Sequence, residues 1–144
     1  ALSSAASDVY KRQADYMERV VEEAKKNGYV ETLFGRRRYL PELASSNFNM
    51  RAFGERVARN MPIQGTAADI IKIAMVHVRN RLKAEKLDAK LILQVHDELI
   101  VECPEAESDT VKKILEEEMA NAVQLSVPML AEAGSGKSWY QAKG

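Results

Sequence analysis

Cysteine is nearly absent from this 144-residue sequence, because Cys103 is the only one and no internal disulfide can form. The sequence also has no apolar run near the ~20 residues of a membrane-spanning helix. Its first residues, ALSSAASDVYKRQ, lack the apolar segment of a signal peptide. Aromatic residues make up 6% of the chain, yet 46% is hydrophobic, which is enough for a core. We therefore expect one domain, or part of one, in a reducing compartment and without a membrane span.

The net charge is zero, but the charges are unevenly placed. Residues 33–83 carry ten Lys or Arg against three acidic residues, whereas residues 97–124 carry nine acidic residues against two lysines. A basic block beside an acidic block is typical of a polyanion-binding surface next to a cation site. Two solvated faces of opposite sign would give the same pattern, so charge alone leaves both interpretations open.

Hydrophobic periodicity predicts an α/β (α+β) chain in which helices pack on a small antiparallel sheet. Pro62 is expected to break or kink the chain between two of the helices. The expected helices are 8–27, about 48–59, about 64–85 and about 104–124, the expected β-hairpins are 29–41 and 89–103, and a last short strand is expected at 127–133.

The second hairpin, LILQVHDELIVE (91–102), has His96, Asp97 and Glu98 at its tip, where Asn-Gly or Asp-Gly would turn more easily. Adjacent carboxylates repel each other unless a cation lies near them. Mg²⁺ binds one or two carboxylates together with phosphate oxygens, which is the arrangement of two-metal phosphoryl transfer. On spacing alone, an ordinary solvated turn remains the alternative.

The basic block contains two arrangements of possible phosphate donors. Arg56, Asn60 and Gln64 are four residues apart, so they share a helix face if Pro62 only kinks the helix. Such side chains can donate to phosphates and to minor-groove acceptors, although a solvated helix face is the competing interpretation. The consecutive arginines of the first hairpin should point to alternate faces of a strand and not all meet one surface; they are Arg36, Arg37 and Arg38.

Four segments together resemble the C-terminal part of family A DNA polymerases, the bacterial DNA polymerase I type. They occur in the family's order and spacing and cover most of residues 14–143, and the pairing of QVHDE with NMPIQGTAAD is highly specific. The segments are GYVETLFGRRRYLPEL (28–43), ERVARNMPIQGTAADIIKIAM (55–75), LILQVHDELIVECP (91–104) and VPMLAEAGSGKSW (127–139).

The resemblance implies a DNA-directed DNA polymerase, in which a primer 3′-hydroxyl attacks the α-phosphate of a dNTP. Asp97 would be the motif C carboxylate that binds the catalytic Mg²⁺, Glu98 a second catalytic residue, and His96 a contact to the primer terminus. Arg56, Asn60 and Gln64 would hold template-primer DNA, partly through the minor groove. Backbone contacts are implied for Arg36, Arg37, Arg38 and Arg59.

The resemblance also implies how the chain is divided. Residues 1–13 have no counterpart, 14–144 would be the C-terminal part of the polymerase domain, about 29–60 would lie on the fingers side, and about 61–144 would form the palm with its motif C hairpin. The partners would be template-primer DNA and a dNTP bound mostly outside this segment, with no membrane. The parent would be a monomer in the bacterial cytoplasm, associated with the nucleoid.

The sequence departs from the family in lacking the upstream DYSQIELR-like strand, which carries the other metal-binding aspartate. ADYMER (14–19) resembles only its first residues, and the fingers helix that binds the nucleotide is missing too. We therefore expect an incomplete polymerase domain that does not polymerise on its own.

Three other functions fit parts of the sequence. AEAGSGKS (131–138) resembles a P-loop, but only WYQAKG follows where a helix must begin. A non-catalytic DNA-binding module would use the basic block alone. A metallohydrolase built on His96 and Asp97 would need further histidines, and His77 is the only other one.

Overall fold

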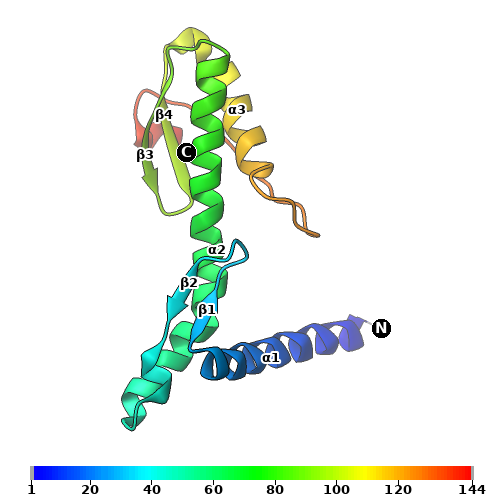
Figure 1. Ribbon diagram of the computed structural model, residues 1–144. Helices are drawn as coiled ribbons and strands as arrows, with labels where there is room; N and C mark the ends of the chain where they lie inside the picture. Colours follow the sequence, from blue (N-terminus) through cyan, green and yellow to red (C-terminus); the bar gives the residue numbers. More distant parts are fainter. Residues whose placement is uncertain (1, 144) are drawn as a thin grey trace. The chain divides into compact units, whose positions relative to one another are not determined.

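The computed structural model describes residues 2–143, with side chains from residue 8 onward (Figure 1). The described chain forms two compact units, one up to Thr66 and one from Ala67 onward, and α2 contributes to both. The elements are α1 (Leu2–Asn27), β1 (Tyr29–Glu31), β2 (Arg37–Tyr39), η1 (Pro41–Ala44), α2 (Phe48–Ala84), β3 (Lys90–Val95), β4 (Glu98–Glu102), η2 (Glu105–Glu107), α3 (Ser108–Ala120) and α4 (Trp139–Ala142).

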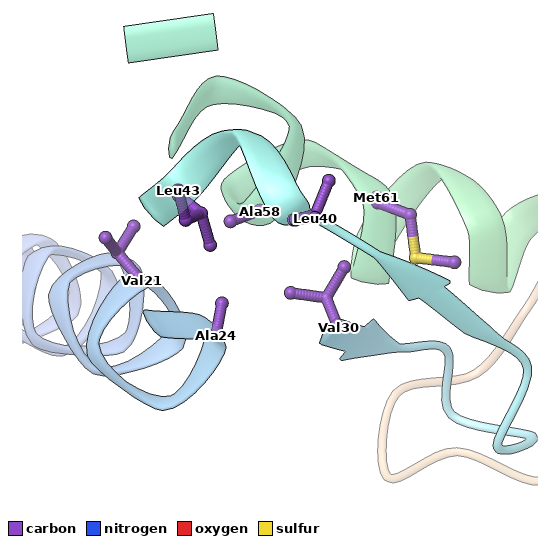
Figure 2. Packing of buried hydrophobic residues seen from close by; sticks show 7 residues of the cluster. All are labelled: Val21, Ala24, Val30, Leu40, Leu43, Ala58 and Met61. Atoms are coloured by element: carbon purple, nitrogen blue, oxygen red, sulfur yellow. The ribbon is translucent and has the colours of Figure 1, made fainter. Parts of the chain in front are cut away.

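Unit 1 is built around the end of α1 and the hairpin that follows it. Gly28 ends α1 in the left-handed region, with φ +80°, and its N–H donates to the Ala24 carbonyl at 2.8 Å. β1 and β2 then pair antiparallel, with Tyr29 opposite Tyr39. The core of this unit gathers buried side chains from α1, β1, η1, α2 and the residue that joins β2 to η1 (Figure 2): Val21, Ala24, Val30, Leu40, Leu43, Ala58 and Met61.

The helix α2 runs without interruption through Pro62, so the predicted separation into two helices is wrong. Proline removes one backbone donor and strains the preceding turn, at a cost of about 3 kcal/mol. Ala58 and Met61, on the turn before it, are buried in the core of unit 1, and this packing offsets the cost. The hydroxyl of Thr66 also donates to the Pro62 carbonyl.

Unit 2 packs the β3–β4 hairpin and α3 against the residues of α2 from Ala67 onward (Figure 1). The predicted hairpin is confirmed: β3 and β4 are antiparallel, with an irregularity between Leu91 and Leu93. The Glu107 carboxylate fixes the loop before β3, because both of its oxygens accept backbone N–H groups, those of Asp88 and Ala89, at 3.1 Å. The buried residues of the unit are Ile70, Ala74, Val78, Leu82, Ala89, Val111, Ile114 and Ala122.

The end of the chain differs from the prediction. Residues 127–133 form no strand, since the two sheets of the described chain are the pairs β1–β2 and β3–β4. This stretch is instead held by side-chain contacts: Met129 packs on the buried residues Ile70, Ala74 and Ala122 of unit 2, and the Ala133 N–H donates to Glu116 at 2.9 Å. The overall prediction of helices with small antiparallel sheets is confirmed. None of the described helices has the length and apolarity to cross a membrane.

Candidate nucleic-acid interface and carboxylate hairpin

The tip of the β3–β4 hairpin, which consists of His96, Asp97 and Glu98, is a tight turn with an unusual backbone. Val95 pairs with Glu98, so His96 and Asp97 form a two-residue loop. His96 has φ +52° and Asp97 does not have a positive φ, a pattern typical of a type II′ turn, where glycine is the usual first residue. A non-glycine residue in this region costs about 1–2 kcal/mol. The sequence therefore places a histidine at a turn position where glycine would cost less free energy.

The carboxylates of the hairpin tip face solvent to different extents. Asp97 is exposed, and its carboxylate has no hydrogen-bond or ion-pair partner among the described residues. Glu98 is half-buried, and its Oε2 lies 3.8 Å from the Lys143 Nζ. No group of three or more His, Cys, Asp or Glu residues is gathered for a metal in the described chain. The tip can thus supply one or two oxygens to a hard cation, as Mg²⁺ sites do when phosphates supply others.

Unit 1 contains a basic pocket of about 650 Å³, called the arginine pocket below. The predicted common face of Arg56, Asn60 and Gln64 is confirmed, because all three line this pocket from α2. Its lining is positively charged and includes three apolar side chains. Its walls also include Arg36, Arg37, Arg38, Phe53, Val57, Met61 and Gly65.

All three consecutive arginines border the arginine pocket, but Arg37 and Arg38 alternate as predicted, since Arg37 lies opposite Glu31 and Arg38 opposite the buried Val30. Arg36 precedes β2, which begins at Arg37, so alternation applies only to Arg37 and Arg38. Arg37 is held in place by its neighbours: its Nε donates to Glu31 at 2.5 Å and its guanidinium lies 4.3 Å from the Tyr29 ring centre. The hydrogen bond to Glu31 raises the pKa of Arg37 above its usual value.

Arg59 lies on α2 but is not among the residues that line the arginine pocket. Its guanidinium is 3.8 Å from the Glu55 carboxylate, which also pairs with Lys25 of α1 at 3.1 Å. The hydrogen bond from Lys25 lowers the pKa of Glu55. In this structure, the side chain of Arg59 therefore joins a charged cluster that connects α1 to α2.

Four residues of the pocket lining were not predicted as site residues: Phe53, Val57, Met61 and Gly65. Phe53 precedes Arg56 by three residues, so helical spacing could have placed it on the same face. Gly65 has no side chain to suggest a role. It matters because an added Cβ would lie 2.8 Å from Cγ2 of Thr32, in the turn between β1 and β2.

The structure does not support the P-loop or the metallohydrolase. In the described chain, no strand leads directly into residues 131–138, and the four residues of α4 are too few to complete a phosphate cradle. His77 faces α3, where its Nδ1 lies 3.8 Å from Glu118.

Comparison with known proteins identifies the family. A model of DNA polymerase family A matches residues 4–141. The chain belongs to DNA polymerase family A. Among its family A relatives, DNA polymerase I of Bacillus subtilis (strain 168) is 56% identical and that of Bacillus caldotenax 55% identical, each over 128 residues. Both alignments cover 89% of this chain, but only 14% and 15% of the respective relatives.

A solved family A structure matches the fold as well. The polymerase domain of Pol1 from M. smegmatis, in complex with DNA primer-template and dNTP, has a TM-score of 0.88 and 48% identity. The match covers 91% of this chain and 23% of that chain. The chain therefore spans a small part of the relatives that it matches.

Proposed function

We propose that the chain is part of a DNA-directed DNA polymerase, which transfers a nucleotide from a dNTP to a primer 3′-hydroxyl. The arginine pocket carries this proposal. Four arginines and two amide side chains converge there within a family whose M. smegmatis relative binds primer-template DNA and dNTP.

In this proposal, the arginine pocket holds template-primer DNA. Arg36, Arg37, Arg38 and Arg56 donate to backbone phosphates, which fixes the position of the duplex without reading its sequence. The amides of Asn60 and Gln64 donate to the minor-groove acceptors that all base pairs present, so any correct pair is accepted. Arg59 could reach a phosphate only after leaving its contact with Glu55.

The hairpin tip supplies the acidic part of the proposed site. Asp97 would be a ligand of Mg²⁺, Glu98 would stand beside it, and His96 would contact the primer terminus. When bound, the metal would lower the pKa of the attacking hydroxyl and stabilise the leaving oxygen. The exposed Asp97 carboxylate fits a partial ligand set. The Lys143 contact would have to open before Glu98 could take part.

The metal role is tested by Asp97→Asn in a full-length relative. The amide keeps the size of the side chain but loses the charge, so primer extension should fall by about 10³-fold or more while primer-template affinity stays the same. Asn121→Asp, at an exposed position after α3, is the matched charge-change control and should leave extension intact. Extension near the wild-type rate in Asp97→Asn would eliminate the metal role.

A second function is supported by unit 1 considered alone. The arginine pocket lies wholly within this unit, so it could bind DNA without the hairpin tip. Salt-dependent DNA binding by the chain, unaffected by Mg²⁺, would favour such a non-catalytic module. Within the main proposal we also infer a monomer that acts at the bacterial nucleoid.

A further inference from the structure

The turn between β1 and β2 is fixed by its own hydrogen bonds. The Gly35 N–H donates to the Thr32 carbonyl at 3.0 Å, and the Thr32 N–H donates to the Arg36 carbonyl at 3.0 Å. The Thr32 hydroxyl accepts from the Arg36 N–H at 3.2 Å, and the residue is 5% exposed. Gly35 has φ +80°, which suits glycine. These hydrogen bonds therefore fix the backbone of Arg36 at the end of the turn.

One hydroxyl group, that of Thr66, ties the same turn to α2. Thr66 accepts the Leu33 N–H at 2.9 Å and donates its own proton to the Pro62 carbonyl. Both contacts need a group that donates and accepts at one oxygen, which threonine and serine provide and valine does not.

Gly65 allows the turn to approach the helix closely. A Cβ at this position would lie 2.8 Å from Thr32 Cγ2 and 3.4 Å from the Arg36 Nη2. The Gly65 carbonyl accepts from that same Nη2 at 3.2 Å, so the helix backbone orients the guanidinium. Arg36 thus lines the arginine pocket because of contacts at Gly65 and Thr66.

We propose that Gly65 and Thr66 are positioning residues for DNA binding: they hold the Thr32–Arg36 turn against α2 so that Arg36 faces the same DNA backbone as Arg56. This inference rests on the proposed function. Thr66 touches no DNA in this account and acts only through Arg36.

The decisive variant is Thr66→Val, which removes the hydroxyl and keeps the shape. Binding of the 144-residue chain to a fluorescent primer-template is measured by anisotropy between 50 and 200 mM salt. We expect roughly three-fold weaker binding and a salt slope reduced by up to about 0.9, the contribution of one phosphate contact. Thr66→Ser should restore both values. In an Arg36→Ala background, Thr66→Val should change the affinity less than two-fold.

A second variant removes the same hydrogen bond, between the Leu33 N–H and the Thr66 hydroxyl, by a change in the turn. Leu33→Pro removes the N–H that Thr66 accepts, and proline is favoured at the second position of such a turn. It should reproduce the reduced salt slope without altering α2, so the test does not depend on whether Thr66→Val folds. Gly54→Ala is the control: its Cβ would lie 3.1 Å from Leu43, away from the pocket lining. It should lower thermal stability and leave the salt slope unchanged.

The outcomes separate two failures. If the wild-type chain shows no salt-dependent binding, the proposed DNA interface fails and the positioning role fails with it. If the wild type binds but Thr66→Val and Leu33→Pro bind with the same slope, only the positioning role is overturned. It is also overturned if Thr66→Val weakens binding equally with and without Arg36, or if Thr66→Ser does not restore binding.

Discussion

In unit 1 the charged pocket is backed by a core and its turn is tied to a helix, whereas in unit 2 the charged residues occupy a two-residue turn. Arg36 and Arg37 each have a partner that orients them, the Gly65 carbonyl and the Glu31 carboxylate. At the hairpin tip, Asp97 has no side-chain partner among the described residues, and His96 adopts a left-handed backbone.

This difference separates two ways of preparing a site. The arginine pocket is preorganised, so little conformational entropy is lost when a polyanion binds. The hairpin tip keeps its carboxylates accessible at the cost of turn strain, and residues in such conformations cluster at functional sites. We therefore expect DNA binding to depend on packing in unit 1. Metal-dependent chemistry should survive a substitution in unit 1 only if the variant still binds DNA.

The largest expected effects come from truncating the two cores. Leu40→Ala in unit 1 and Ile114→Ala in unit 2 remove side chains that are 2% and 1% exposed, and each should cost about 2–5 kcal/mol of unfolding free energy. Under conditions where both variants remain folded, only Leu40→Ala should weaken DNA binding, because Leu40 follows the strand that carries the arginines. Urea unfolding and anisotropy measure the two effects. Equal loss of DNA binding in both variants would contradict the comparison.

Smaller effects of opposite sign are expected at the two turns. His96→Gly relieves the left-handed backbone and should stabilise the chain by about 1 kcal/mol, although it removes the imidazole. Gly35→Ala imposes the same kind of strain in unit 1 and should destabilise it by about 1 kcal/mol. Thermal unfolding of both variants tests this pair. A loss of stability in His96→Gly would show that the imidazole itself supports the fold.

The sequence predicted features that depend on local pattern. The 3.6-residue period placed Arg56, Asn60 and Gln64 on one face, and Gly28 marked the end of α1. The features that it missed depend on contacts distant in sequence. Continuity through Pro62 follows from the burial of its neighbours, and the pocket that Arg36, Arg37 and Arg38 border is completed by residues of α2.

The tie between Thr66 and the turn was not predicted either. It joins residues 33 positions apart, and nothing in either segment marks the partner. The residues of the hairpin tip left a metal site and an ordinary turn both open, and only the structure shows that His96 takes the position usual for glycine.

The smallest expected effect compares one carboxylate in each unit. Lys25 lowers the pKa of Glu55 in unit 1, and Arg81 lowers the pKa of Glu117 in unit 2. A depressed native pKa stabilises the fold above the unfolded pKa, near 4.5, and this stabilisation is lost as the pH falls through the native value. Glu55→Gln and Glu117→Gln should therefore be less stable than the wild type at pH 7 and approach its stability as the pH falls below the unfolded pKa and through the native one.

Urea midpoints at several pH values measure these differences, and added salt should shrink both because the carboxylates are solvent-accessible. Arg81 also bonds Glu85 and Glu118, so it connects α2 and α3 through several carboxylates, whereas Glu55 depends mainly on Lys25. Loss of Glu117 leaves those other contacts in place, and we expect Glu117→Gln to show the smaller deficit at pH 7. A pH-independent deficit in either variant would mean that the carboxylate supports its unit by packing rather than by charge.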